Sequence, residues 1–453
     1  MEQDFKKIRL EKLENLKKMG VNSYPAKFDR THTSAEALKL KMGAKKVRVA
    51  GRLMLIRDLG RICFAHIQDG AGRIQIAFNE KEIGKEQYKF FIKNFDLGDF
   101  IGVEGETFKT KAGEKTILVK KFEILTKSLL PLPDKWHGIT DTEERYRRRH
   151  LDLIFNKEAK EKFITRNKII KSLTGFLEDK GFLEVDTPII QPMAGGAIAE
   201  PFKTRYNAYD ADVYLRIAPE LYLKRLIIGG FEKVYEIGKA FRNEGVDANH
   251  NPEFTILEFY WAYADYENLM KLTEEMLIRL AKDVFGKNYI TAGGKKIIFK
   301  KPFARKTFAQ VTGGKKSDEA FKNGIKKLIQ PTFVIDHPTE LLPLAKKNKD
   351  GKTVQSFQLI VAGQELVKAY SELNDPADQL ARFEEQDKNR KKGDKEAHQV
   401  DNNYIEALEY GMPPTAGWGM GVDRLVKLLT DSETLREIMF FPYMREKDKK
   451  IKN

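Results

Sequence analysis

Apolar residues recur at two different intervals along the chain, and these intervals predict two kinds of domain. Residues 4–19 carry apolar side chains at helical spacing among charged ones, and Gly20 ends that helix. From residue 47 to about residue 120 the interval shortens to that of β-strands, and turn sequences separate five short runs. A helical stretch falls between the third and fourth runs. We therefore expect an N-terminal helix followed by a five-stranded β domain.

The five runs suggest a small closed barrel of the OB type. Such barrels often bind single-stranded nucleic acid by stacking bases on aromatic rings and by following the backbone with cations. The candidate contact residues here are Arg57, Phe64 and Gln75. A single phenylalanine in a strand is more often a core residue than a stacking platform, so the pattern alone favours the core for Phe64.

The pattern changes after residue 130. Pro131–Asp134 indicates a linker, and a basic run at 145–150 either contacts phosphate or begins the next domain. A long amphipathic helix is predicted over residues 158–180. Beyond it the strands occur as hairpin-like neighbours, which favours an antiparallel sheet flanked by helices and hence an α+β domain. We expect an N-terminal domain at 1–130, a linker at 131–150 and a second domain at 151–453.

Composition and charge indicate a class of partner. The chain has 453 residues, enough for two or three domains with cores of their own. Its 81 Lys and Arg against 66 Asp and Glu leave a formal net charge of +15, which points to a polyanion, with nucleic acid as the leading candidate. A lysine-rich surface that serves only solvation is the alternative that charge leaves open.

Two features of the sequence bear on location. The single cysteine, Cys63, permits no intrachain disulfide and no zinc site built on cysteines, which favours a reducing compartment. No stretch approaches the apolar length of a membrane span, and the first twenty residues mix acidic with basic side chains, unlike a signal peptide. We expect a cytoplasmic protein without a membrane partner.

Two arginines are the first candidates for chemistry. Arg242 begins a polar loop at the end of a predicted strand, and Arg424 follows the glycine-rich Gly417–Gly421. A guanidinium meets phosphate or carboxylate oxygens with two parallel hydrogen bonds, although a single arginine more often makes only a surface ion pair. The repeated glycines would let backbone approach a ligand closely. Rossmann and P-loop patterns do not occur, so we expect another kind of site, with ATP and a carboxylate between the arginines.

Four acidic residues stand in positions that are unusual for a surface: Glu220, Glu258, Glu365 and Glu372. A carboxylate in such a position either points to solvent or must be paired, because an isolated buried charge is costly. Several carboxylates around one cavity would suit a dicationic ligand, a metal ion, or both.

These motifs resemble those of the class II aminoacyl-tRNA synthetases. Phe241–Glu244 with its following loop resembles motif 2, Gly417–Arg424 resembles motif 3, and the helix that ends before Pro188 resembles motif 1. Leu215–Lys224 and Ser371–Asp375 look like the bacterial lysyl-tRNA synthetase family. The resemblance covers nearly the whole chain in order. It implies an OB-fold anticodon-binding domain, a class II catalytic domain, and a homodimer in which motif 1 builds the interface.

The resemblance implies a two-step reaction in which lysine and ATP, with Mg²⁺, form lysyl-adenylate, and the lysyl group then passes to the 3′ end of tRNA(Lys). By position, Arg242 would bind the lysine carboxylate and the α-phosphate, while Arg424 would bind the terminal phosphate and cover the adenine. Phe254 would stack on the other adenine face. Glu365 would be a catalytic and metal-binding carboxylate. The remaining ATP contacts implied are Glu244, His250 and Gly421.

The resemblance also implies a pocket for the two ammonium groups of lysine. Glu220 would bind the α-ammonium, and Gly196 would leave room beside the substrate. The residues implied for the side-chain ammonium are Glu258, Tyr260 and Glu372, and the other lysine contacts are Arg242, Tyr370 and Gly419. In the barrel, Arg57, Phe64, Gln75 and Glu114 fall where the family reads a uridine-rich anticodon, which favours base stacking for Phe64.

The sequence departs from the family at the implied metal site. Gln358 stands where bacterial members carry a metal-binding Glu, and Lys368 stands where they usually have Asn. Both changes should weaken divalent-ion binding near Glu365. Either Lys368 partly replaces a metal by meeting phosphate or Glu365, or Gln358 ligates magnesium through its amide oxygen and Lys368 points aside. The stretch at about 305–330 also looks shorter than the family's helical insertion.

Other interpretations remain open. An aspartyl or asparaginyl enzyme of the same class is one, although an aspartate pocket would need cations near Glu220. A synthetase-like protein that binds tRNA without catalysis is another, and the retained Arg242, Arg424 and Glu365 argue against it. A ligase that attaches lysine to a protein would leave the barrel without an anticodon to read.

Overall fold

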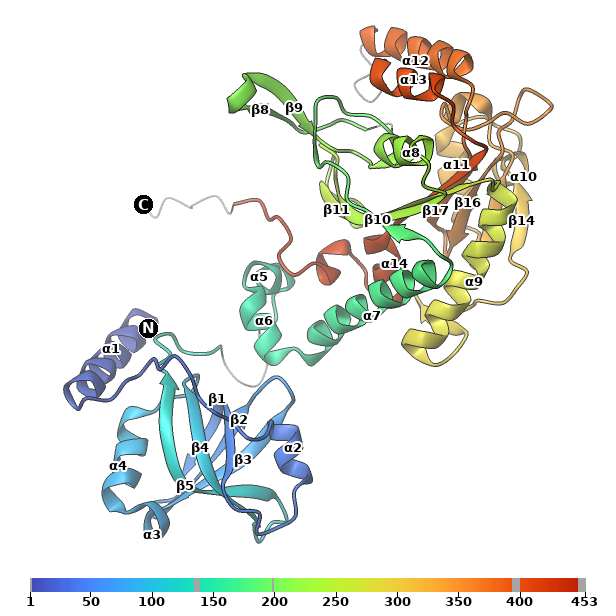
Figure 1. Ribbon diagram of the computed structural model, residues 1–453. Coiled ribbons are helices and arrows are strands. Elements are labelled where there is room, and N and C mark those ends of the chain that lie inside the picture. Colours follow the sequence, from blue (N-terminus) through green and yellow to red (C-terminus); the bar gives the residue numbers. More distant parts are fainter. Residues whose placement is uncertain (1, 134–138, 198, 393–399, 447–453) are drawn as a thin grey trace, which may run out of the picture. The chain divides into compact units, whose positions relative to one another are not determined.

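The computed structural model describes residues 2–133, 139–197, 199–392 and 400–446 and divides the chain into two compact units, Met1–Thr140 and Asp141–Asn453 (Figure 1). Part of the predicted linker, residues 134–138, lies outside the described residues. Helices α5 (Thr142–Arg147) and α6 (Arg149–Phe155) already belong to the second unit. Arg149, from the basic run, is 1% exposed and pairs with Asp152 at 2.8 Å, so this arginine begins the structure of the second unit.

The first unit is the five-stranded barrel that the sequence predicts. Its strands are β1 (Val47–Asp58), β2 (Ile62–Gln68), β3 (Arg73–Asn79), β4 (Phe100–Lys109) and β5 (Lys115–Thr126), closed in the order β1-β2-β3-β5-β4. The helices are α1 (Glu2–Lys18), α2 (Ser34–Lys39), α3 (Glu80–Ile83) and α4 (Lys85–Asn94), the last two between β3 and β4 as expected. In β2 every second residue is buried, because alternate side chains of a strand face the barrel core.

An eight-stranded sheet organises the second unit. Its strands are β6 (Leu183–Glu184), β10 (Lys233–Phe241), β11 (Glu253–Ala262), β14 (Ala304–Thr307), β15 (Thr332–Ile335), β16 (Ser356–Val361), β17 (Gln364–Ser371) and β18 (Thr415–Gly421). They follow the order β14-β15-β16-β17-β18-β11-β10-β6. The strands from β15 to β10 pair antiparallel as predicted, whereas the outer pairs β14–β15 and β6–β10 are parallel. The sheet is therefore mixed at its edges.

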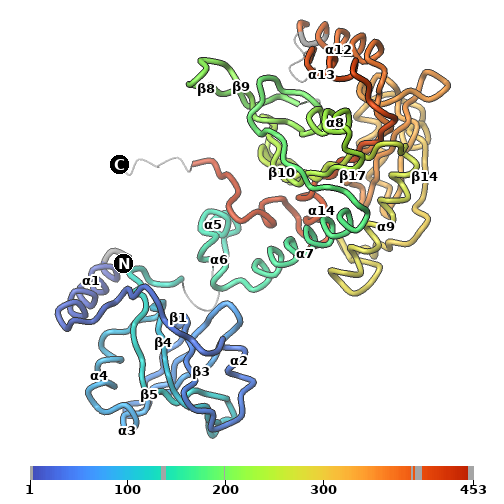
Figure 2. The backbone as a smooth tube through the Cα atoms, in the orientation of Figure 1, coloured from blue at the N-terminus to red at the C-terminus, as the bar shows by residue number. Residues whose placement is uncertain are grey.

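Helices cover the sheet, as Figures 1 and 2 show. The main core packs α7 (Lys157–Asp179), α9 (Tyr266–Phe285) and α14 (Val422–Leu429) against the sheet, where Phe259 stacks on Trp418 at 4.7 Å. A second core includes α8 (Glu220–Ile228), α12 (Pro376–Lys391) and α13 (Asn402–Glu409). The predicted long helix becomes α7 because Asn156 caps its start at 3.0 Å and Gly181, at φ +80°, follows its end.

Smaller elements complete the second unit. A three-stranded sheet contains β7 (Ile190–Gln191), β8 (Lys203–Tyr206) and β9 (Ala211–Leu215), and a hairpin contains β12 (Tyr289–Ala292) and β13 (Lys295–Ile298). Helices α10 (Phe308–Thr312) and α11 (Asp318–Ile325) fall in the stretch that looks like a shortened insertion, and 3-10 turns lie at Asn207–Tyr209, Thr339–Leu341 and Leu435–Ile438. Across the described residues, none of the helices combines the length and the apolarity that crossing a bilayer requires.

Candidate active site

The strand register gathers polar residues on one face of the large sheet. Glu258 pairs with Gly419, Gly419 with Lys368, and Lys368 with Gln358, so one row crosses β11, β18, β17 and β16. Paired residues of antiparallel strands project from the same face. Their neighbours along each strand, including Phe259 and Trp418, face the helix-covered core instead. Segments far apart in the sequence thus meet at one site.

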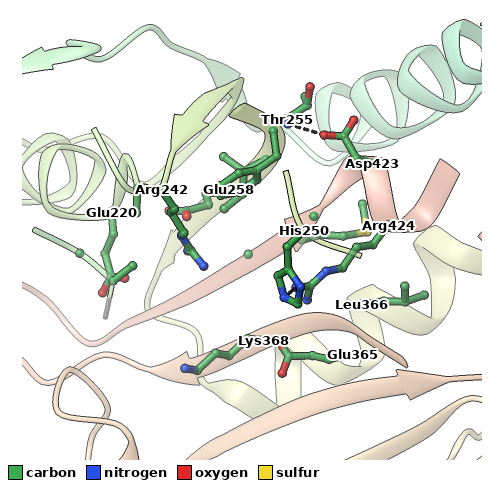
Figure 3. A pocket seen from close by; sticks show the side chains of 18 of the residues that line it. Glu220, Arg242, His250, Thr255, Glu258, Glu365, Leu366, Lys368, Asp423 and Arg424 are labelled. Carbon is green, nitrogen blue, oxygen red and sulfur yellow. Dashed lines mark hydrogen bonds between the residues drawn. The ribbon is translucent and has the colours of Figure 1, made fainter. Parts of the chain in front are cut away.

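A cavity of about 270 Å³ lies on this polar face (Figure 3). The residues expected to bind ATP or lysine that line it are Gly196, Glu220, Arg242, Glu244, His250, Phe254, Glu258, Tyr260, Glu365, Tyr370, Gly419, Gly421 and Arg424. Glu372 and Gln358, at 1% and 9% exposure, are buried close behind the wall. The residues predicted from the sequence therefore share one cavity.

The two arginines reach the cavity from different elements. Arg242 follows the end of β10, and its guanidinium lies 5.1 Å from the centroid of the Phe254 ring. Arg424, on α14, lies within 3.0 Å of Nε2 of His250, and the two side chains meet in Figure 3. Because a guanidinium only donates, Nε2 accepts, and Nδ1 of His250 donates to Asp247 at 2.8 Å. Arg424 is thereby oriented by an imidazole that Asp247 holds in place.

Asp423 fixes the first turn of α14, which carries Arg424. The sequence alone did not indicate this role. Its carboxylate accepts a hydrogen bond from the backbone N–H of Thr255 at 2.7 Å and pairs with Arg166 of α7 at 2.6 Å. Arg166 also donates to the hydroxyl of Thr255 at 2.9 Å. The link ties α14 to β11 and α7. Nothing in the local sequence identifies Arg166, which is distant along the chain.

Three carboxylates and one internal ammonium form the acidic end of the site. Lys224 lies one helical turn after Glu220 on α8 and pairs with both Glu220 and Glu372. Burial alone would lower the pKa of Lys224, but the two carboxylates raise it above its usual value. The hydroxyl of Tyr370 donates to Glu220 at 2.8 Å. The spacing of Glu220 and Lys224 was the available signal for this pair, and sequence reasoning did not use it.

Glu258 carries the third carboxylate. Burial raises the pKa of Glu258 to about 8, the charge of Glu220 adds to the rise, and Arg242 opposes it. Its polar neighbour is the hydroxyl of Tyr260, which lies 3.4 Å away. When all are ionised, Glu220, Glu258 and Glu372 against Lys224 leave two negative charges at this end. The site therefore complements a ligand with two positive charges.

Two glycines leave the space that this arrangement needs. A Cβ on Gly417 would lie 2.0 Å from Oε1 of Glu372 and 2.5 Å from the Tyr260 ring. Gly196 has φ +89°, and a Cβ there would lie 3.0 Å from the Cβ of Glu220. Gly417 is thus required by close packing, and Gly196 by its backbone conformation.

Gln358 and Glu365, the implied metal-binding pair, are hydrogen-bonded to each other. Gln358 donates from its amide Nε2 to Glu365 at 2.6 Å, and its Oε1 accepts from Nε2 of His337 at 2.8 Å. Burial lowers the pKa of His337 to about 4, so the ring is neutral near pH 7. The amide oxygen of Gln358 is therefore occupied, and these two residues do not fit a shared magnesium ion. Within the described ranges, no cluster of three or more His, Cys, Asp or Glu side chains is arranged for a metal ion.

Lys368 lines the same part of the cavity. Burial lowers the pKa of Lys368, the Glu365 carboxylate opposes that shift, and Arg242 adds to it. Two cations, Lys368 and Arg242, thus lie close enough to influence each other across the cavity. An anion between them would be held from both sides.

The expected anticodon residues share one face of the barrel. Phe64 pairs with Arg57 across β1 and β2 and is half-buried between the buried Cys63 and Ala65, so its ring belongs to the outer face rather than the core. Gln75 donates to Glu114 at 2.7 Å. His66, which sequence reasoning did not select, contacts the same carboxylate at 2.9 Å. The ring of Phe64 therefore shares this face with the cation of Arg57 and with the hydrogen-bonded side chains around Glu114.

Comparison with known proteins gives two family matches. Residues 141–445 match the family described as tRNA synthetases class II (D, K and N), and residues 47–125 match the OB-fold nucleic acid binding domain. These two spans fall on the sheet unit with its cavity and on the barrel.

Several curated relatives are similar over nearly their whole length. A lysine–tRNA ligase from Carboxydothermus hydrogenoformans is 49% identical and covers 98% of this chain and 98% of its own. One from Pelotomaculum thermopropionicum is 48% identical, at 98% and 96% coverage, and one from Bacillus cytotoxicus is 46% identical, at 97% and 97%.

Proposed function

The chain belongs to the lysine–tRNA ligase family of class II tRNA synthetases, and we propose that its cavity joins L-lysine to AMP before the lysyl group passes to the 3′ end of tRNA(Lys). The family is ATP-dependent. The observation that carries the choice of lysine is the charge of the acidic end, where three carboxylates surround one internal ammonium. The two remaining negative charges match the two ammonium groups of lysine, whereas aspartate would bring an additional anion.

The lysine contacts follow from the position of each carboxylate. Glu220, beside Gly196 at the cavity wall, takes the α-ammonium, and Glu258 with Tyr260 takes the side-chain ammonium. Glu372 acts from behind Gly417 through the charge it shares with Lys224. A neutral analogue of lysine would leave buried carboxylates unpaired, which is costly.

The nucleotide occupies the opposite end, next to Arg424. We assign the ATP contacts to Glu244, His250, Phe254, Gly421 and the two arginines. Arg242 leaves its stacked position over Phe254 to meet the lysine carboxylate and the α-phosphate, and the ring becomes free for the adenine. Catalysis then consists of holding the carboxylate in line with the α-phosphorus and stabilising the developing charge, with no protein nucleophile.

Mg²⁺ is the proposed cofactor, and the protein offers it few ligands. Mg²⁺ would arrive with ATP, whose phosphates supply oxygen ligands, and the protein would add the carboxylate of Glu365. Gln358 contributes no ligand in its present orientation, because its oxygen accepts from His337.

The barrel takes the anticodon. We assign this role to the first unit, Met1–Thr140, and the catalytic role to the second unit, Asp141–Asn453. Phe64 stacks a base, Arg57 meets the phosphate backbone, and Gln75 with Glu114 reads base edges. We propose that the protein acts in the cytoplasm, where it would meet its tRNA.

A homodimer completes the proposal. Apolar side chains are exposed along the segment that resembles motif 1, with Ile164 at 40% and Leu183 at 50% exposure, and Ile190, just after that segment, is 58% exposed. Exposed apolar side chains that gather on one segment favour an interface between copies of the chain. Light scattering coupled to size-exclusion chromatography distinguishes a dimer from a monomer of 52.2 kDa.

Amino-acid-dependent exchange of pyrophosphate into ATP tests the central proposal. Each of the twenty amino acids is supplied in turn, and charging of tRNA(Lys) is measured next. We expect exchange with lysine alone and charging only of tRNA(Lys). Exchange with aspartate in place of lysine would overturn the pocket assignment. Exchange with none of them would instead support a tRNA-binding protein without catalysis.

A further inference from the structure

Lys368 places an unpaired cation in the catalytic cavity. In the part of the chain that the structure describes, its ammonium forms neither an ion pair nor a hydrogen bond. It stands in the polar row between Gly419 and Gln358, and Figure 3 shows it with Glu365 on the wall opposite Arg242. A partly buried ammonium without a protein partner is costly unless a ligand supplies the anion.

The residue opposite Lys368 is prevented from binding a metal ion. If the amide of Gln358 were reversed, its oxygen would face the Glu365 carboxylate at 2.6 Å without a proton between them. The observed orientation instead gives each polar atom a partner, with Nε2 of His337 donating to Oε1 of Gln358. His337 is 3% exposed, and its Nδ1 lies 3.1 Å from the hydroxyl of Ser356, so the ring is held from both sides. Repulsion between the two oxygens would therefore oppose any reversal.

A bulge brings Glu365 and Lys368 to the same cavity. The pairing of β16 with β17 shifts between Leu359 and Ile360, so Leu366 has no direct partner. Without that shift the alternation of a strand would send residues 365 and 368 to opposite faces. Glu365 and Lys368 both line the cavity. The carboxylate is thus committed to the Gln358 amide and lies near an ammonium, rather than facing a second oxygen ligand.

We propose that Lys368 is a catalytic residue whose ammonium replaces one divalent cation in lysine activation. It binds the anion held against Arg242, which is the lysine carboxylate before the reaction and the α-phosphate during it. This inference rests on the proposed lysine activation. It adds Lys368 to the catalytic residues and predicts one divalent cation fewer in the site. The His337–Gln358–Glu365 chain excludes a metal ion from the position that Lys368 serves.

The chemistry requires charge but no proton transfer from Lys368. A carboxylate oxygen of lysine attacks the α-phosphorus, and the bond from that phosphorus to the bridging oxygen of pyrophosphate breaks. Pyrophosphate leaves with the bonding electrons. Negative charge accumulates on the non-bridging α-phosphate oxygens meanwhile, and the two cations facing them stabilise it. Lys368 keeps its proton throughout.

Counting bound metal ions tests the proposal without turnover. Mn²⁺ is titrated into the full chain saturated with α,β-methylene-ATP, and free Mn²⁺ is followed by electron paramagnetic resonance. The double variant Gln358→Glu with Lys368→Asn restores a second carboxylate and removes the ammonium. We expect it to bind about one more Mn²⁺ per active site than the parent does. An equal number in both proteins would overturn the replacement.

Ligand binding tests the direct contact, also when the double variant does not fold. The affinities for L-lysine and for L-lysinol, which lacks the carboxylate, are compared by calorimetry in the parent and in Lys368→Met. We expect lysine to bind about tenfold more weakly in the variant and lysinol about equally well in both. An equal loss for both ligands would indicate a merely structural role and overturn the contact.

Exchange kinetics supply the matched comparison. Lys368→Met should lower kcat for lysine-dependent exchange by about 10 to 1,000-fold without recovery at high Mg²⁺, while Lys368→Arg retains part of it. The exposed Lys327, replaced by methionine, should leave exchange unchanged. Activity of Lys368→Met within about twofold of the parent would contradict the proposal. Parent protein without exchange would contradict the proposed function instead, and the Mn²⁺ count would still report on the cation.

Discussion

Lys224 and Glu372 form an ion pair in which both side chains have 0% exposure. The two oxygens of Glu372 have no other hydrogen-bond partner among the described residues. Such a pair is not a source of net stability, because burying both charges costs about as much as their attraction returns. Burial raises the pKa of Glu372, and the ammonium of Lys224 opposes that rise by favouring the ionised carboxylate. The pair is thus a structural part of the proposed lysine pocket.

Removing the ammonium should destabilise the protein strongly. Lys224→Met keeps a long side chain but leaves Glu220 and Glu372 without their internal cation. We expect the free energy of unfolding to fall by about 3–5 kcal/mol, measured with urea in the absence of lysine. The control is Lys180→Met, which breaks an exposed pair with Glu275 and should cost less than about 1 kcal/mol. Equal losses in the two variants would show that burial of the pair is unimportant.

The affinity for lysine should rise with pH. Because burial raises the pKa of Glu258 to about 8, the empty site holds this carboxyl mostly protonated at neutral pH. Lysine needs the carboxylate, so its affinity increases as the pH rises through about 8. Glu258→Gln should bind lysine about 10 to 100-fold more weakly and without this increase. Calorimetry at several pH values measures the affinity for lysine. A parent affinity that falls as the pH rises through this range would refute the proposed role of Glu258.

Glu258 also predicts how stability depends on pH. Its folded pKa lies above the unfolded value, so between about 4.5 and about 8 the folded protein binds the extra proton. This contribution to stability is present at low pH and is lost as the pH rises towards 8. Glu258→Gln should remove that part of the slope. We therefore expect the Tm of the variant, relative to the Tm of the parent, to be higher in alkaline buffer than in acid buffer. A gap independent of pH would contradict the raised pKa.

A methyl group on Gly417 should close the pocket. In Gly417→Ala the new Cβ would lie 2.0 Å from Glu372, which is itself held by Lys224 and has little room to move. We expect lysine-dependent exchange to fall by about 100-fold or more while the protein remains folded by circular dichroism. Gly175→Ala in α7 meets no atom within 4 Å and should change exchange very little. Similar losses in both variants would show that the close approach has no special role.

The ring of Phe64 should act on tRNA only. Phe64→Ala is expected to weaken tRNA(Lys) binding by about 1–3 kcal/mol, the usual contribution of one stacked base, and to leave lysine-dependent exchange intact. Phe5→Ala removes an exposed ring elsewhere in the first unit and is the control. Filter binding with tRNA(Lys) measures both. A loss of exchange in Phe64→Ala, or an equal loss of tRNA affinity in Phe5→Ala, would argue against anticodon stacking.

Local patterns were sufficient for much of the fold. The period-2 alternation in β2 predicts the barrel because alternate side chains must face its core. Helix α7 was predicted within about one residue at each end, since its cap and its terminal glycine are encoded next to it. The parallel pairing of the edge strands β6 and β14 was not predicted, because the direction of an edge strand depends on a connection that no local pattern records.

The cavity also has features that the sequence predicts and features that only the folded structure reveals. Arg242, Arg424 and Glu258 stand in motifs whose spacing is readable along the chain, so the sequence by itself determined the family and the residue types of the site. Only the tertiary structure decided which side chains pair with one another. Lys224 forms ion pairs with two glutamates, and a hydrogen bond from His337 fixes the orientation of the Gln358 amide. The physical reason is that charge sharing and hydrogen-bond direction depend on atoms brought together by strand register and helix packing. Those contacts join residues that are far apart in the chain.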